Sequence, residues 1–258
     1  MIKFFRQIRQ NLLMENRTGK YFKYAIGEIV LVVIGILIAL QINNWNQDRL
    51  NRKAEKETLI NLKQDLGSAM DQLIIKIYQN DAYRHLDSTA LSIIHNNIEI
   101  STDSIYGLLL SHIYTPTFDP ELGTLTEILS TGKMEIIQNE LLRNHISSWN
   151  KFMDELSEVD NRLIYLDDHF KAPLYMKILP YRNSLNRIIN PNSTDPLIKP
   201  ISKSNFQPSV KESFYSLEFE NILSNYLIYG LIQRERLGDI KNKITDMISI
   251  IERDLGHD

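Results

Sequence analysis

The chain has 258 residues, a formal net charge of −3 and no cysteine. The absence of cysteine excludes a lipid-modified cysteine as a membrane anchor and means that the core is built without disulfides. Residues 1–23 hold six basic side chains and one acid, so the rest of the chain is acidic, which argues against nucleic acid as a partner.

Residues 1–20 form a basic arm that we expect to lie in the cytoplasm. In MIKFFRQIRQNLL the apolar residues recur at helical spacing, and basic and amide side chains occupy the other positions. This pattern is typical of a short amphipathic helix on an anionic membrane surface. Alternatively, the basic residues only fix the membrane topology, which requires no helix. With so little chain inside the cell, we expect no cytoplasmic output domain.

Residues 21–45 are predicted to be a transmembrane helix. Ala25 to Ile42 is an almost unbroken run of Ile, Leu, Val, Ala and Gly, and 18 helical residues span about 27 Å, close to the ~30 Å core of a bilayer. Tyr21, Tyr24 and Trp45 flank the run as an interfacial aromatic belt. A core helix of a soluble protein rarely runs this long without a polar face. No small-x-small cleavage site follows, so we interpret the segment as an uncleaved signal anchor.

The charges on either side of this helix predict its orientation. Three basic residues follow the helix in residues 43–53, and the six that precede it are Lys3, Arg6, Arg9, Arg17, Lys20 and Lys23. This bias favours a cytoplasmic amino terminus, with residues 46–258 outside the cytoplasm, in the periplasm if the cell has two membranes.

Two stretches resemble a known family. MIKFFRQIRQNLL and GKYFKYAIGEIVLVVIGILIALQINNWN, within residues 1–46, closely resemble the amino terminus of an uncharacterised family of small single-pass membrane proteins of Bacteroidota. ILSTGKMEIIQNELLRNHISSW, within residues 121–149, resembles more loosely a segment of their extramembrane part. The resemblance implies a bacterial inner-membrane protein. It implies no activity and no catalytic residues.

One face of the predicted transmembrane helix is small and polar. A carboxylate within a bilayer is costly, so Glu28 is a candidate functional residue. Spacings of three and four place it on one face with other residues, and this seam comprises Ala25, Glu28, Val32, Gly35, Ala39 and Ile42. Small residues let membrane helices approach closely, so the seam predicts contact with a second copy or with another membrane protein. Alternatively, Glu28 lies near the cytoplasmic edge and meets water, Tyr24 or Lys23.

The rest of the chain is predicted to be helical. Residues 46–57 are polar without Pro or Gly and can continue the membrane helix as a stalk. A clean apolar stripe follows, formed by Leu59, Leu62, Leu66, Met70, Leu73 and Ile77. Further helical patterns cover residues 82–98, 103–110, 121–129, 139–170, 212–229 and 233–255, with Gly132 as a C-cap and Asn139 as an N-cap.

Strand signals are nearly absent, so the predicted fold is all-α. It consists of one N-terminal transmembrane helix followed by a bundle of long antiparallel helices, with an irregular proline-rich insertion at residues 180–212. About 200 residues are enough to bury a single core.

No constellation of residues predicts catalysis. The chain contains no HExxH, no Glu-x-x-His pair, no GxSxG and no Gly-rich phosphate loop, so we expect no enzymatic activity, no metal and no cofactor. Asp167, Asp168 and His169 are adjacent, but neighbours on a helix point to different sides and make a poor ligand set. The acidic run at residues 154–160, which includes Asp160, is interpreted as a solvated helix face.

Ten aromatic residues crowd residues 165–229, around the proline-rich insertion. They indicate either a recognition surface with a small pocket or, the interpretation we favour, rings that hold an irregular loop on the bundle. Three functions remain open. The chain is a membrane-anchored interaction or scaffold protein, an accessory subunit of an ion-driven membrane machine that uses Glu28, or a ligand-sensing helical bundle.

Overall fold

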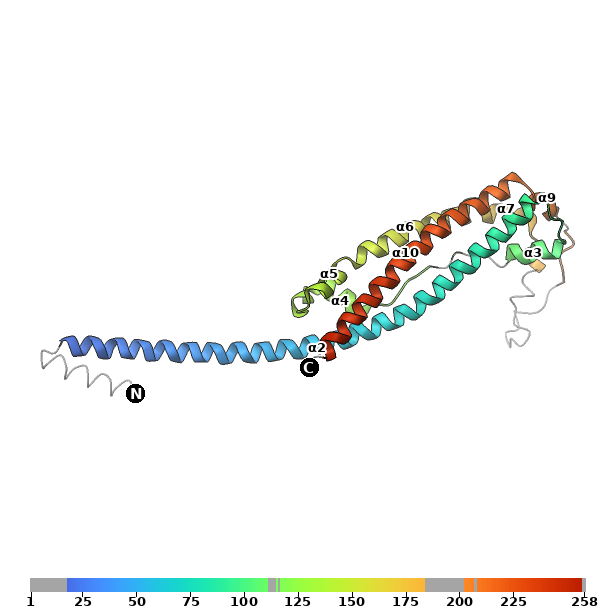
Figure 1. Cartoon of the computed structure of the whole chain (residues 1–258). Coiled ribbons are helices and arrows are strands. Elements are labelled where there is room, and N and C mark those ends of the chain that lie inside the picture. The colour runs from blue at the N-terminus through green and yellow to red at the C-terminus, as the bar shows by residue number, and fades with distance from the viewer. Residues whose placement is uncertain (1–17, 111–114, 116, 184–201, 207, 257–258) are drawn as a thin grey trace. The chain divides into compact units, whose positions relative to one another are not determined.

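The computed structural model describes residues 18–110, 115, 117–183, 202–206 and 208–256. These residues contain no strand, and the predicted all-α fold is confirmed. The arm of residues 1–17 and most of the proline-rich insertion lie outside the described residues. The elements, labelled as in Figure 1, are α2 (Thr18–His95), α3 (Thr102–Leu110), α4 (Gly123–Thr131), η1 (Lys133–Ile136), α5 (Glu140–Ser147), α6 (Trp149–Leu166), η2 (Asp167–Lys171), α7 (Ala172–Ile178), α9 (Val210–Phe214) and α10 (Leu217–Gly256).

The chain divides into two compact units, residues 1–57 and 58–258. The described part of the first unit is the beginning of α2, which is helical throughout the predicted transmembrane run and the polar stalk after it. The second unit is a bundle built on the remainder of α2 together with α6 and α10.

Helix α2 is longer than the sequence pattern predicts. We expected one helical segment to end near Ile77 and another to begin near Ala82, but the helix runs unbroken to His95. The intervening residues include neither Gly nor Pro, and the Asn80 side chain bonds across to α10 instead of to its own backbone. The helix ends in a Schellman motif, in which Asn97 takes a φ of 49° and the Ile98 N–H donates to the Ile93 carbonyl at 3.0 Å.

Local capping explains the shorter helices. The Ser101 Oγ accepts a hydrogen bond from the Ser104 N–H at 3.1 Å, at the start of α3. Gly132 ends α4 with a φ of 74°, a left-handed conformation in which a side chain would be strained. The Asn139 Oδ1 accepts from the Leu142 N–H at 3.1 Å and caps α5. Both Gly132 and Asn139 have the capping roles that the sequence predicts.

The predicted single helix over residues 139–170 is interrupted twice. Ser148 separates α5 from α6, and its Oγ bonds the Asn144 carbonyl at 2.7 Å. A π-helical turn, η2, then follows α6 and leads into α7. We expected the helical pattern to end near residue 170, but Pro173 lies in the first turn of α7, directly after the π-helical turn, and α7 continues to Ile178.

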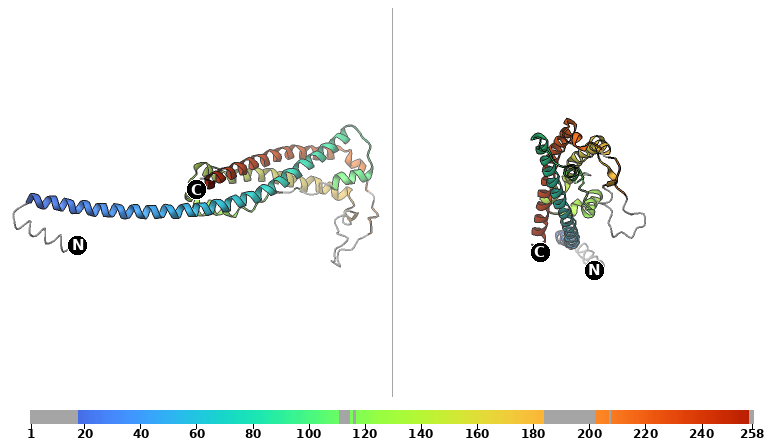
Figure 2. Two further views of the ribbon diagram at one scale, coloured as in Figure 1. Left: turned by 60° about the horizontal axis from the view of Figure 1, so that its bottom comes forward. Right: turned by 90° about the vertical axis from the view of Figure 1, so that its right-hand side faces the viewer.

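The bundle has two apolar cores. The first lies among α2, α4, α5, α6 and α10, with fully buried residues such as Leu62, Leu66 and Ile244. The second gathers α3, α7 and α9 around the ends of α2 and α6 and the start of α10, with Ile105 and Phe214 fully buried. Figures 1 and 2 show α3 and α9 at the end of the bundle where α2 ends, and α4 and α5 toward the other end.

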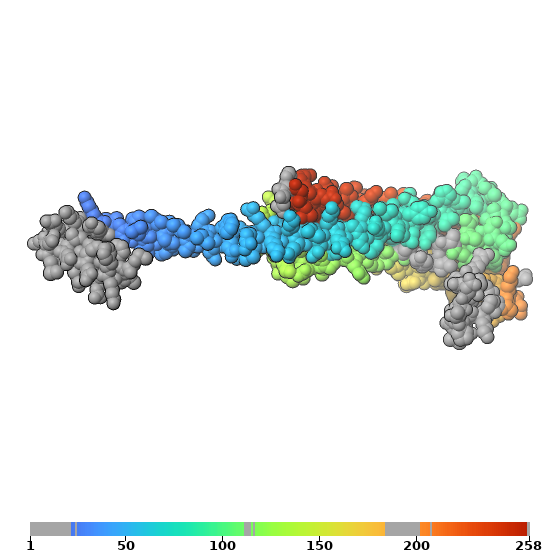
Figure 3. All heavy atoms as spheres, turned by 90° about the horizontal axis from the view of Figure 1, so that it is seen from below, coloured from blue at the N-terminus to red at the C-terminus, as the bar shows by residue number. Residues whose placement is uncertain are grey.

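The long helices lie side by side and α10 is antiparallel to both α2 and α6. Lys63 pairs with Glu252 at 2.9 Å and Asn80 bonds Gln233 at 2.8 Å, so residue numbers rise on α2 as they fall on α10. On the face seen in Figure 3, the α2 residues of this unit lie between α10 on one side and α4 and α5 on the other. This arrangement brings the middle of α2 and α10 together with that of α6.

Candidate functional site

The predicted transmembrane run is the first candidate site. Within the described residues, α2 is the one helix long and apolar enough to cross a membrane, and none of its apolar run is buried. Large apolar side chains such as Ile29 and Leu31 are more than 60% exposed. Folding of the chain normally buries such a surface, so these side chains require an apolar environment from elsewhere.

The seam residues lie on this exposed helix. Val32 and Ile42 are about as exposed as their apolar neighbours, and a Cβ built at Gly35 meets no atom within 4 Å. The seam as a contact surface therefore stays a prediction. Of the interfacial belt, Trp45 is 66% exposed, whereas the side chains of Tyr21 and Tyr24 lie outside the description. Among the topology charges, Lys23 is exposed; Lys3, Arg6, Arg9 and Arg17, and the side chain of Lys20, are not described.

The second candidate site is a layer of buried polar residues between the two apolar cores of the bundle. Each long helix contributes to it, and the polar layer comprises Lys76 and Asn80 from α2, Asp160 from α6, and Gln233 from α10. All four are at most 6% exposed. Buried polar groups of this kind are tolerated only when they find partners.

Hydrogen bonds join the polar layer across three helices. The Gln233 Nε2 donates to Asp160, and the Gln233 Oε1 accepts from the Asn80 Nδ2 at 2.8 Å. The same Asn80 Nδ2 also donates to the carbonyl of Gly230 at 3.0 Å. A Cβ at Gly230 would lie 3.0 Å from the Arg84 Cγ, so any other residue at this position would force the Arg84 side chain to shift.

Lys76 and Asp160 supply opposite charges to the layer. The Lys76 Nζ lies 4.0 Å from the Asp160 Oδ1. Burial raises the pKa of Asp160, partly offset by the charge of Lys76, and burial lowers the pKa of Lys76 against the attraction of Asp160. For both side chains the loss of hydration outweighs the attraction between the two charges. The buried environment therefore favours the neutral form of each side chain.

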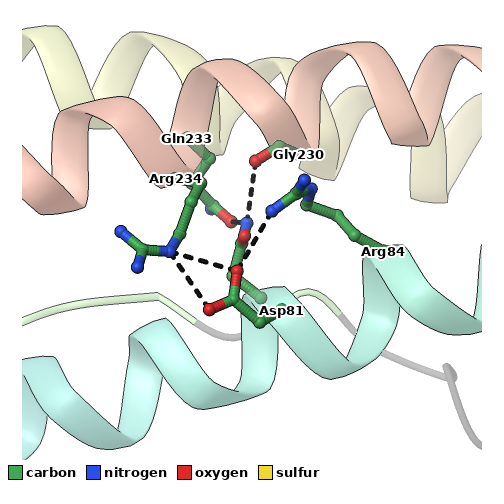
Figure 4. Close-up of polar contacts among 6 residues, drawn as sticks. Asp81, Arg84, Gly230, Gln233 and Arg234 are labelled. Atoms are coloured by element: carbon green, nitrogen blue, oxygen red, sulfur yellow. Dashed lines mark hydrogen bonds and ion pairs between the residues drawn. The ribbon is translucent and has the colours of Figure 1, made fainter.

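Arg84 and Arg234 lie beside the layer and both contact Asp81 (Figure 4), and these three side chains are more exposed than the members of the layer. The Arg234 Nε lies 3.1 Å from the Asp81 Oδ1, and the Arg84 Nη1 lies 3.0 Å from the same oxygen. Asp81 therefore joins α2 to α10 one residue beyond Asn80. Because these side chains are partly exposed, each contact adds little to stability by itself.

A further buried group surrounds the π-helical turn. Asp167 accepts from the Tyr226 hydroxyl and from the Thr115 hydroxyl, each at 2.5 Å, and pairs with Lys171. The Lys171 Nζ also lies 4.7 Å from the centre of the Tyr226 ring. Burial raises the pKa of Tyr226 and lowers that of Lys171. Turns of this type are frequent at functional sites, although here the buried groups satisfy one another.

The cavities beside these groups are small. One cavity of about 20 Å³ lies among Asp87, Lys171, Tyr175 and Tyr226 with apolar neighbours, and another of about 20 Å³ lies among Asn80, Arg84, Thr115, Gly230 and Gln233. A volume of this size holds roughly one water molecule. The aromatic residues of the region 165–229 fall into two groups. Some are buried in the second core, namely Tyr175, Phe214, Phe219 and Tyr226, and others are exposed, namely Tyr165, Phe170 and Phe206.

The sequence pattern does not predict the polar layer. Asp160 was assigned to a solvated helix face, but it is 6% exposed, so that interpretation is wrong. On α10 the buried positions at this level are Tyr226, Gly230 and Gln233, whereas Leu231 is 50% exposed. The one signal in the sequence is that Asp160 alone interrupts the helical spacing of apolar residues that runs from Leu142 to Leu166.

Comparison with known proteins identifies a family whose function is unknown. A model of a family of unknown function, DUF6090, matches residues 28–175, which include much of the transmembrane run, Asp160 and the π-helical turn. Neither the curated proteins nor the solved structures include a match. Since the family model covers more than half of the chain, the protein belongs to DUF6090, a family of unknown function.

Proposed function

We propose that the protein is a membrane-anchored interaction protein, held in the bilayer by α2 and presenting a helical bundle outside it. The observation that carries this proposal is the unburied apolar run of α2. An apolar helix of this length left in water would be a strong aggregation hazard, whereas in a bilayer it is satisfied.

The membrane is a bacterial inner membrane, with the amino terminus in the cytoplasm and residues 46–258 in the periplasm. Six basic residues before the span and three after it support this orientation. The resemblance of residues 1–46 to proteins of Bacteroidota supports the bacterial assignment. A protease added outside the cytoplasmic membrane is expected to digest the carboxyl-terminal body in intact spheroplasts.

The seam is the contact surface within the membrane. Glu28 is the one acid in the apolar run, and Gly35 and Ala39 give a flat face along which a second helix can approach. The partner is a second copy of this chain or the helix of another membrane protein. On the bundle, the polar layer supports a scaffold role, because groups that must pair across three helices favour one alignment of those helices.

Cysteine crosslinking in native membranes tests the seam. The chain has no cysteine, so single cysteines at Val32 and Ala39 report the seam, and matched cysteines at Val30 and Leu37 report the opposite face. We expect covalent dimers from the seam positions and few from the controls. Equal crosslinking from both faces contradicts a specific seam. No crosslinks, together with no membrane protein that co-purifies in mild detergent, contradict the interaction role.

A role as a subunit of an ion-driven machine rests on Glu28 alone. A Glu28→Gln variant with unchanged assembly and unchanged growth phenotype would end that alternative. The two cavities beside the buried polar groups have room for about one water each. Ligand sensing would therefore use the open hollow of about 580 Å³ that is lined by residues such as Leu122, Trp149 and Met153.

A further inference from the structure

Two residues of α2, each with one buried polar atom that lacks a hydrogen-bond partner, line the same small cavity. Asn80 and Arg84 are one helical turn apart, and both line the cavity of about 20 Å³ that also touches Thr115, Gly230 and Gln233. Among the described residues, neither the Asn80 Oδ1 nor the Arg84 Nε has a hydrogen-bond partner, although both atoms are buried. Asn80 is 5% exposed as a whole.

The neighbouring contacts fix what each atom offers. The Asn80 Nδ2 donates to the Gly230 carbonyl and to the Gln233 Oε1, so the amide is oriented with its oxygen as the remaining acceptor. The Arg84 Nη1 is engaged by Asp81, as Figure 4 shows, and the Nε–H remains as a donor. A ligand in this cavity must therefore donate one hydrogen bond and accept another.

This requirement selects the chemical class of the ligand. A metal cation or ammonium cannot accept from the guanidinium, and a halide cannot donate to the amide oxygen. A water molecule does both, and the cavity exceeds the 10–15 Å³ that a water needs by a small margin. We propose that the cavity is a specific internal hydration site, in which one water bridges the Asn80 Oδ1 and the Arg84 Nε.

The bridging water joins two groups that the direct contacts leave separate. Asn80 belongs to the polar layer that reaches Asp160 through Gln233, and Arg84 belongs to the pair that holds Asp81. With the water in place, hydrogen bonds run continuously from the buried aspartate on α6 to the more exposed ion pair between α2 and α10.

A structure of the full-length protein in detergent, at a resolution that shows ordered water, tests the site directly. We expect a peak within hydrogen-bond distance, about 3 Å, of both the Asn80 Oδ1 and the Arg84 Nε. A parallel data set with bromide in place of chloride is expected to show no anomalous peak there. A bromide peak, a protein atom in the same place, or a dry cavity each overturns the proposal.

Two matched variants test whether Arg84 is the donor that holds the water. Arg84→Met removes the Nε donor, and Asp81→Asn removes the anion opposite Arg84 while keeping that donor. We expect the peak to be lost or strongly weakened in Arg84→Met and retained in Asp81→Asn. An undiminished peak in Arg84→Met contradicts the assignment of Arg84. If Arg84→Met does not fold, the map of the unsubstituted protein still decides whether the site holds water.

Discussion

Lys76 and Asp160 face each other between the two apolar cores of the bundle, with the Lys76 Nζ 4.0 Å from the Asp160 Oδ1 and both residues at most 6% exposed. They come from helices that are far apart in the sequence, and no apolar side chain separates the two charges. A buried pair at this distance gains some attraction but loses the hydration of both ions, so it contributes more to alignment than to stability.

The first prediction concerns this pair. Lys76→Met leaves Asp160 without its counter-ion, and we expect the free energy of unfolding to fall by roughly 3–5 kcal/mol. Replacing both residues, as in Lys76→Met with Asp160→Leu, removes both buried charges and should recover most of that loss, although the Gln233 amide loses its acceptor. Denaturant unfolding of the full-length protein in mild detergent measures both values. A double variant as unstable as the sum of the two single variants would contradict a direct coupling.

The second prediction is a pH dependence. Burial raises the pKa of Asp160 above its ordinary value of 3.8, so the folded state holds this proton more tightly than the unfolded state. The resulting stability is fully present below pH 3.8 and is lost as the pH rises through the pKa of the folded state. The free energy of unfolding, followed upward from pH 3.8, should therefore contain a decrease that is absent in Asp160→Asn. Asp154→Asn, on the exposed side of the same helix, is the control, and it should leave the decrease in place.

Capping and apolar spacing could be predicted from the sequence because they are local. Asn139 caps α5 through a contact three residues away, and the stripe from Leu59 to Ile77 packs on one face of α2. Such features depend on residues within one or two turns. The amphipathic pattern also gave the all-α fold.

The polar layer could not be predicted because its partners are distant in the sequence. Asp160 meets Gln233 across 73 residues, and Asn80 meets the same side chain across 153. A single polar residue in an apolar stripe looks like an interruption until its partner is known. The same contacts explain why Gly230 and Gln233 of α10 face the interior of the bundle, whereas Leu231 faces outward.

The third prediction uses two glycines of α10. A methyl group at Gly230 would meet the Arg84 Cγ at 3.0 Å, whereas a methyl group at Gly238 finds its nearest neighbour, the Arg234 Nη1, at 3.8 Å. Gly→Ala in a helix interior gains up to about 1 kcal/mol from helix propensity. We expect this gain for Gly238→Ala, and for Gly230→Ala a net loss, because Arg84 and the contacts of Asn80 must shift. Thermal unfolding of both variants side by side measures the difference, and equal stabilisation by both would show that α2 does not approach α10 as described.

The fourth prediction concerns the start of α5. The Asn139 Oδ1 caps the helix, and the Asn139 Nδ2 donates to both carboxylate oxygens of Asp254, at 3.1 and 2.9 Å. Asn139→Ala removes the cap and the link to the end of α10, and the free energy of unfolding should fall by about 1–2 kcal/mol. Asn139→Asp retains the capping oxygen but places a carboxylate against Asp254, so its loss should shrink when Asp254→Asn is added. If Asn139→Ala and Asn139→Asp respond alike to Asp254→Asn, the contact between α5 and α10 is not formed through this side chain.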